Sequence, residues 1–126
     1  MHKRLLNPER LRKIPPHFSW IDHRLVRDNY FVRCDHQAWT LYLFLSSVAD
    51  AQGLSYYSDA SLMRQLKLDG LALSASRQQL VHAGLIAYER PLYQVLSLEP
   101  EAVGAARSGP IRVGELLRQV LAGGQP

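Results

Sequence analysis

The stretch from Ser58 to Leu98 constrains the fold most, because its pattern predicts two short helices followed by a two-stranded hairpin. The first helix is expected to run to Leu66, with Ser58 or Asp59 as its N-cap. Leu62 and Leu66 stand one helical turn apart and should lie on its buried face. A short turn, Lys67-Leu68-Asp69-Gly70, should then redirect the chain into the second helix.

The second helix is expected over Leu71–Ala83 and should stop at Gly84, since glycine tolerates the left-handed backbone beyond a helix end. Its inner face shows helical spacing in Leu73, Ser76, Leu80 and Ala83. Two segments rich in aliphatic and aromatic residues follow, Leu85–Tyr88 and Tyr93–Leu96. Because only residues 89–92 separate them, they predict a hairpin of two strands.

These residues resemble the winged helix-turn-helix of GntR-type and MarR-type bacterial regulators and of plasmid replication initiators. The resemblance lies in the runs 58–69 and 76–86, above all in a leucine, three residues and then Gly-Leu-Ile (Leu80 to Ile86). The whole sequence also resembles a family of small proteobacterial proteins, through the runs 18–24, 53–57 and 91–98. The resemblance implies a fold more firmly than an activity.

Length and composition predict one globular domain. The chain has 126 residues, 47% of them hydrophobic, which suffices for a single core. No apolar run approaches the roughly 20 residues that span a bilayer, and no apolar segment follows the basic N-terminus as in a secretory signal. Since the only cysteine, Cys34, cannot form an internal disulfide, we expect a reducing, cytoplasmic location without membrane partners.

Positive charge is concentrated at the N-terminus. Residues 1–17 contain a single carboxylate, and their net charge equals the +4 of the whole chain. The five cations of this segment are Lys3, Arg4, Arg10, Arg12 and Lys13. Two roles remain open for it: an arm that lies along DNA phosphates, or a solvated terminus that packs on another subunit.

The expected fold class is α+β and mainly helical, a winged helix-turn-helix with an N-terminal extension and a C-terminal helix. We divide it into a basic arm (1–17), the winged-helix domain with its extension (18–98), a linker (99–112) and a C-terminal amphipathic helix with its tail (113–126). That helix either forms a homodimer or folds back on its own domain.

Before the helix-turn-helix, three features are expected. Residues 18–21 should form a short strand or a docked extended segment, Asp22 should cap a short helix, and residues 30–32 should be strand-like, with Trp20 and Phe31 as anchors. A long helix over His36–Ala49 should begin at the N-cap Asp35 and occupy the core or a subunit interface. A short strand over 54–57 should pair with the hairpin.

Double-stranded DNA is the expected partner, because the second helix should present glutamine, serine and histidine outward, and a major groove about 12 Å wide admits such a helix. Its first turn is acidic or apolar, which is atypical of helices that read bases. The predicted DNA-binding residues are Lys3, Arg4, Arg10, Arg12, Lys13, Lys67, Ser74, Arg77, Gln78, His82 and Arg90.

Catalysis finds little support. Cys34, Asp35 and His36 are adjacent, but no second His or Cys pair supplies zinc-like spacing, and phosphate-binding glycine loops are absent. The sequence therefore predicts a non-enzymatic DNA-binding protein without a cofactor, of transcription-regulator or replication-initiator type. The alternative is a winged helix that binds another protein and no DNA.

Overall fold

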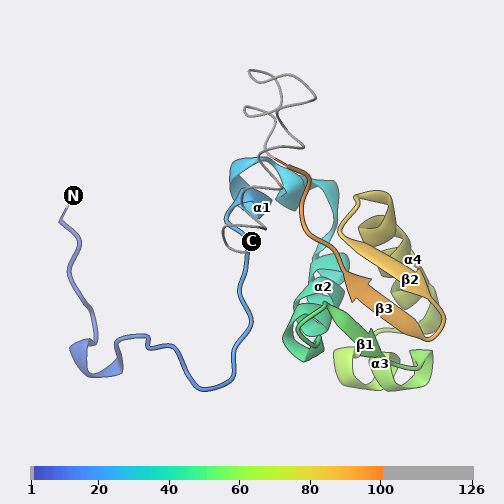
Figure 1. The fold of residues 1–126 in the computed structure, drawn as a ribbon, viewed down its shortest axis with the longest axis horizontal. Coiled ribbons are helices and arrows are strands. Elements are labelled where there is room, and N and C mark those ends of the chain that lie inside the picture. The colour runs from blue at the N-terminus through green and yellow to red at the C-terminus, as the bar shows by residue number, and fades with distance from the viewer. Residues whose placement is uncertain (1, 101–126) are drawn as a thin grey trace, which may run out of the picture. The chain divides into compact units, whose positions relative to one another are not determined.

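The computed structural model describes residues 2–100, which form an α+β fold with four α-helices and one three-stranded antiparallel sheet (Figure 1). In chain order the elements are η1 (Pro8–Arg10), α1 (Arg24–Arg27), η2 (Tyr30–Arg33), α2 (His36–Val48), β1 (Leu54–Tyr56), α3 (Asp59–Leu66), α4 (Gly70–His82), β2 (Ile86–Glu89) and β3 (Leu92–Val95). This arrangement is compatible with a helix-turn-helix followed by a hairpin.

The two helices of the organising stretch form with the caps that their sequence supplies. The Ser58 hydroxyl accepts a hydrogen bond from the amide of Ser61, which starts α3. Lys67 ends α3 in the left-handed conformation, with φ of 56°. The Asp69 carboxylate accepts from the Ala72 amide at 2.7 Å and starts α4 at Gly70, one residue earlier than expected.

The sheet confirms the expected hairpin and its third strand. β3 lies between β1 and β2, and both pairings are antiparallel (Figure 1). Glu89 pairs with Leu92, so only Arg90 and Pro91 form the turn. Tyr93, at the centre of β3, is fully buried.

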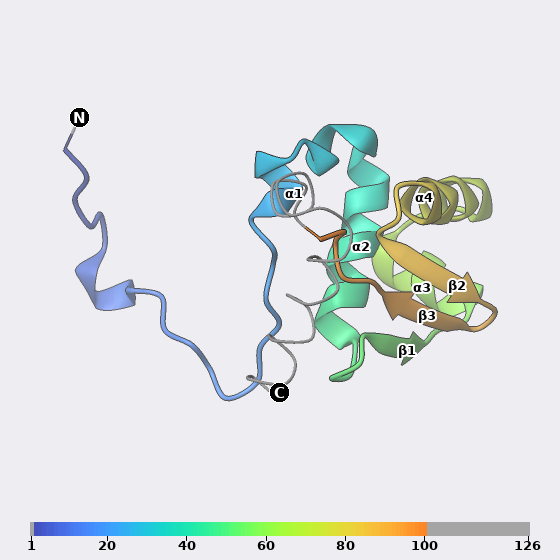
Figure 2. The ribbon, with the colours of Figure 1, turned by 45° about the horizontal axis from the view of Figure 1, so that its top comes forward.

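The long helix α2 confirms its predicted start, since the Asp35 carboxylate accepts from the Ala38 amide at 2.9 Å. It packs against α4, beside which it lies in Figure 2. The core of residues 2–96 comprises Leu25, Tyr30, Ala38, Leu41, Leu45, Leu62, Leu68, Leu73, Leu80, Leu85, Ile86 and Tyr93. Leucines at helical spacing therefore supply most of the apolar surface that α2, α3 and α4 bury.

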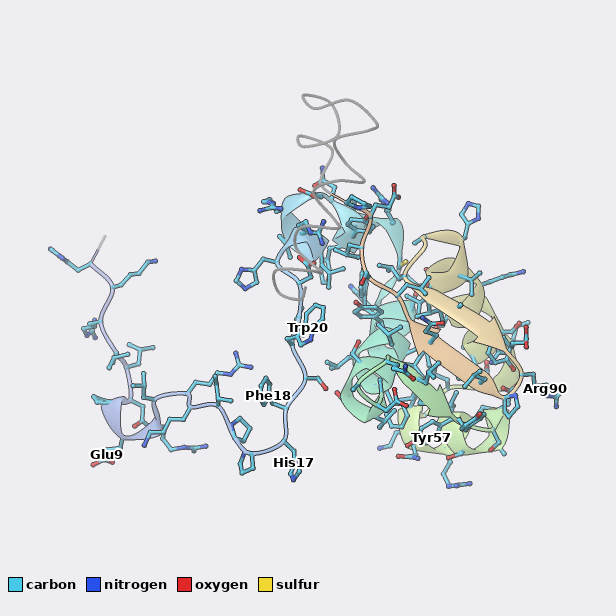
Figure 3. All side chains as sticks on the ribbon, in the orientation of Figure 1. Glu9, His17, Phe18, Trp20, Tyr57 and Arg90 are labelled. Carbon is cyan, nitrogen blue, oxygen red and sulfur yellow. The ribbon has the colours of Figure 1, made fainter. Side chains whose placement is uncertain are left out.

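The N-terminal extension differs from the expectation in two respects. Residues 30–32 belong to the 3₁₀ helix η2 and not to a strand, because Asn29 turns the chain with φ of 64° and Tyr30 is thereby buried. Trp20 is 73% exposed and does not anchor the extension (Figure 3). Phe31 stacks on Trp39 with ring centroids 5.2 Å apart, yet is itself 54% exposed.

Asp22 was expected to cap the short helix that follows it, but the N-cap of α1 is His23. The Asp22 carboxylate, one residue earlier, accepts a hydrogen bond from the Arg24 amide at 2.9 Å. It also pairs with the Arg24 guanidinium at 2.8 Å. The hydrogen bonds from Arg24 lower the pKa of Asp22. The linker expected over 99–112 lies outside the described residues from 101 onward, as does all of the helix expected from 113.

Candidate nucleic-acid interface

One face of α4 is open to solvent along its whole length. Ser74, Gln78 and His82, the residues predicted to face a DNA groove, are all exposed. They stand four residues apart, so they line one side of the helix. Leu71 and Ala75 share this side and are also exposed. We call these five residues the α4 face.

Burial of the opposite side holds this face outward. Leu73, Ser76 and Leu80 are at most 1% exposed and anchor α4 against the core. Gly84 follows with φ of +76°, which turns the chain into β2. The α4 face is therefore presented by a helix whose rotation is fixed by its buried residues.

Arg77, itself among the predicted DNA-binding residues, lies on a different side of α4 from Ser74, Gln78 and His82 and is engaged within the fold. Its guanidinium donates to Asp59 at 3.0 Å and to the Tyr93 hydroxyl at 2.7 Å, and lies 4.3 Å from the centroid of the Tyr88 ring. The Arg77 side chain is only 14% exposed. Burial acts to lower the pKa of Arg77, but the bonds to Asp59 and Tyr93 raise it overall. Through these contacts the Arg77 guanidinium links α4 to α3 and to the hairpin of β2 and β3.

Gln79 ties α4 to the start of α2. Its amide nitrogen donates to the Asp35 carboxylate at 2.9 Å, and its oxygen accepts from the Asp35 backbone amide at 2.8 Å. Together with the helix-capping bond from Ala38, the Gln79 hydrogen bond lowers the pKa of Asp35. This reciprocal pair fixes the C-terminal half of α4 relative to α2.

Three cations lie in the elements next to the α4 face. Lys67 and Arg64 are exposed at the end of α3, and Arg90 is exposed at the turn between β2 and β3 (Figure 3). None of them forms an ion pair with another residue of the described part of the chain. Arg64 was not among the predicted DNA-binding residues, although it stands in the last turn of a predicted helix and off the apolar face formed by Leu62 and Leu66.

The arm cations Lys3, Arg4, Arg10, Arg12 and Lys13 are all exposed. Only η1 gives residues 2–17 regular structure, and Glu9 is the one carboxylate among them. Five positive charges thus follow one another along a mostly extended segment.

In the triplet of Cys34, Asp35 and His36, the first two side chains form hydrogen bonds within the fold. Asp35 caps α2, and the Cys34 thiol lies 3.8 Å from the Gln79 carbonyl oxygen, to which it can donate. Burial raises the pKa of Cys34, which disfavours the thiolate. No group of three His, Cys, Asp or Glu side chains suited to a metal ion occurs in residues 2–100.

No protein family, curated protein or solved structure matches this chain. None of the helices within residues 2–100 is long and apolar enough to cross a membrane.

A second surface feature is formed by α2 and the two short helices that precede it, α1 and η2. A hollow of about 540 Å³ between α1, η2 and α2 is lined mainly by apolar side chains. Val26, Phe31 and Leu43 in this hollow are each more than half exposed. We call it the α1–α2 hollow.

Proposed function

We propose that this chain is a non-enzymatic winged helix-turn-helix protein that binds duplex DNA, in a transcription-regulator or replication-initiator setting and as a homodimer. The observation that carries the proposal is the α4 face. It presents Ser74, Gln78 and His82 to solvent on a helix that contains no acidic residue from Gly70 to His82.

The order of elements supports the winged-helix assignment. A helix-turn-helix, α3 and α4, leads directly into a hairpin whose inner strand pairs with β1 from before the motif. In such an arrangement the second helix enters the major groove and the hairpin reaches an adjacent part of the duplex. The unpaired Arg90 at the hairpin turn suits a phosphate or minor-groove contact.

The availability of cations also supports phosphate binding, although the net charge of residues 34–98 is slightly negative. Asp35 and Asp69 cap helices, and Asp59 pairs with Arg77. Asp50 accepts backbone hydrogen bonds from the turn before β1. The carboxylates are thus largely engaged within the fold, whereas Arg64, Lys67 and Arg90 remain available to phosphates.

In this mechanism α4 lies in the major groove of the duplex with Gln78 directed at base edges. Lys67 and Arg90 contact the DNA phosphate backbone on either side of that groove. The arm adds cations that displace counterions along the duplex, which gives affinity without sequence information. Arg77 acts indirectly, because it fixes α4 against the hairpin.

A fluorescence-anisotropy titration tests the proposal. The full chain is titrated into a pool of short mixed-sequence duplexes at about 50 and 200 mM salt, where electrostatic binding should differ by several orders of magnitude. We expect saturable binding that weakens steeply with salt. An absence of binding at the lower salt concentration would contradict the proposal.

The α1–α2 hollow favours a second candidate function, a winged helix that binds another protein and no DNA. Its exposed apolar side chains are gathered in one place, and such patches mark interaction sites, whereas apolar residues scattered singly over a surface do not. This candidate predicts that Leu43→Asp abolishes association with a protein partner, whereas the DNA proposal predicts unchanged duplex affinity for that variant.

A further inference from the structure

Leu71 is the most exposed large apolar residue of α4, with 83% of its surface accessible. It stands in the first turn, the part of such a helix that contacts bases in helix-turn-helix proteins. The core of the domain is completed by Leu73 and Leu80 and does not need it. Its exposed side chain is therefore available to contact a binding partner.

The α4 face has a defined chemistry. It contains no lysine or arginine, the side chains that most often read guanine, and Arg77 is engaged with Asp59 and Tyr93. Glutamine pairs with the N6 and N7 atoms of adenine, and apolar side chains contact the C5-methyl group of thymine. Leu71, Ala75 and Gln78 thus match the two bases of an A·T pair.

The spacing of these side chains matches successive base pairs. Leu71 and Ala75 are one helical turn apart, and Gln78 follows two turns after Leu71. At about 1.5 Å per residue the separation from Leu71 to Gln78 is roughly 10 Å along the helix. This is about three base-pair steps of 3.4 Å.

We infer that the α4 face selects a short run of A·T pairs, in which Leu71 and Ala75 contact thymine methyl groups and Gln78 pairs with adenine. This inference rests on the proposed function and gives its site a substrate class. The neighbouring cations Lys67 and Arg64 provide charge for the flanking phosphates.

The test compares three duplexes that share identical flanks and differ in a central run of six base pairs. The first has an A·T core, the second replaces each core thymine by deoxyuridine, and the third has a G·C core. The deoxyuridine duplex lacks only the C5-methyl groups. We expect its affinity for the full chain to fall about fourfold for each methyl group contacted.

Two variants assign the contacts. Leu71→Ala should bind the thymine and deoxyuridine duplexes with more nearly equal affinity. Gln78→Ala should keep the thymine preference and lose only the part of the preference for A·T over G·C that the methyl groups do not supply, so that this variant binds the deoxyuridine and G·C duplexes with more nearly equal affinity. Leu43→Ala is the matched control, a leucine 56% exposed on α2, and should behave as the unaltered chain. Each variant changes an exposed side chain.

Equal affinity of the unaltered chain for the thymine and deoxyuridine duplexes would overturn this inference and leave DNA binding intact. An undiminished thymine preference in Leu71→Ala would overturn it as well. If none of the three duplexes is bound at low salt, the proposed function itself fails, and the inference fails with it.

Discussion

Arg77 is the residue at which three elements meet, since its guanidinium contacts Asp59 of α3, Tyr93 of β3 and the ring of Tyr88. We expect Arg77→Met to lower the free energy of unfolding by about 2–3 kcal/mol, because it leaves the buried Tyr93 hydroxyl without a partner. Urea denaturation measures the change. Asp59→Asn should cost less, about 1 kcal/mol, because the Asp59 side chain is 45% exposed. A loss below 0.5 kcal/mol, roughly the effect of an ordinary surface change, would contradict this role for Arg77.

The Asp35 carboxylate should make the free energy of unfolding depend on pH, because its pKa is lower in the folded chain. Its pKa is lowered by the Gln79 side chain and the Ala38 amide. A carboxylate with a lowered pKa stabilises the fold above its unfolded pKa of about 3.9, and this contribution is lost as pH falls through the folded value. Gln79→Ala should therefore raise the pKa of Asp35, measured by carbon-13 NMR of the carboxyl group. Asp22, whose pKa is lowered by Arg24, should not change and serves as the internal reference; an Asp35 pKa unaffected by the substitution would contradict the prediction.

At the scale of elements, the pairing of β1 with β3 depends on Gly53. A Cβ atom there would lie 2.6 Å from the Val95 carbonyl oxygen, and φ is +86°. We expect Gly53→Ala to cost more than about 2 kcal/mol, the sum of backbone strain and this overlap. Gly84→Ala is the control: φ is +76° but nothing lies within 4 Å, so strain alone should cost about 1 kcal/mol. Thermal unfolding compares them, and equal losses would show that the approach to Val95 is unimportant.

Elements with strong local signals could be predicted from the sequence. The predicted caps Ser58 and Asp35 each bond to an amide three residues ahead, and such bonds are set by adjacent residues. Asp69 caps α4 in the same way, although the sequence predicted it to lie in a turn. The strand expected at 30–32 failed because Asn29 turns the chain and tertiary burial of Tyr30 outweighs strand propensity. The α4 face could likewise be predicted from helical spacing. The position of Arg77 could not, since its partners are 16 and 18 residues away and only the folded chain brings them together.

At the scale of the whole molecule, the proposed function divides charge and sequence selection between two parts of the chain. The arm residues Lys3, Arg4, Arg10, Arg12 and Lys13 are exposed outside α3 and α4, whereas the α4 face contains no lysine, arginine, aspartate or glutamate. The arm should therefore supply affinity that is blind to sequence, and α4 should supply selection among sequences.

This division predicts the effect of neutralising the arm. Replacing its five cations by glutamine should reduce the slope of log affinity against log salt by up to about 4.5, since each phosphate contact contributes about 0.9. Gln78→Ala should leave that slope unchanged and relax sequence preference. Glu9→Gln alters the same segment without removing a cation, so it should not flatten the slope. Anisotropy titrations over a salt series measure all three. An unchanged slope in the arm variant would place the phosphate contacts elsewhere, with Arg64, Lys67 and Arg90 as the next residues to neutralise, because these exposed cations lie beside α4 and form no ion pair with the rest of residues 2–100.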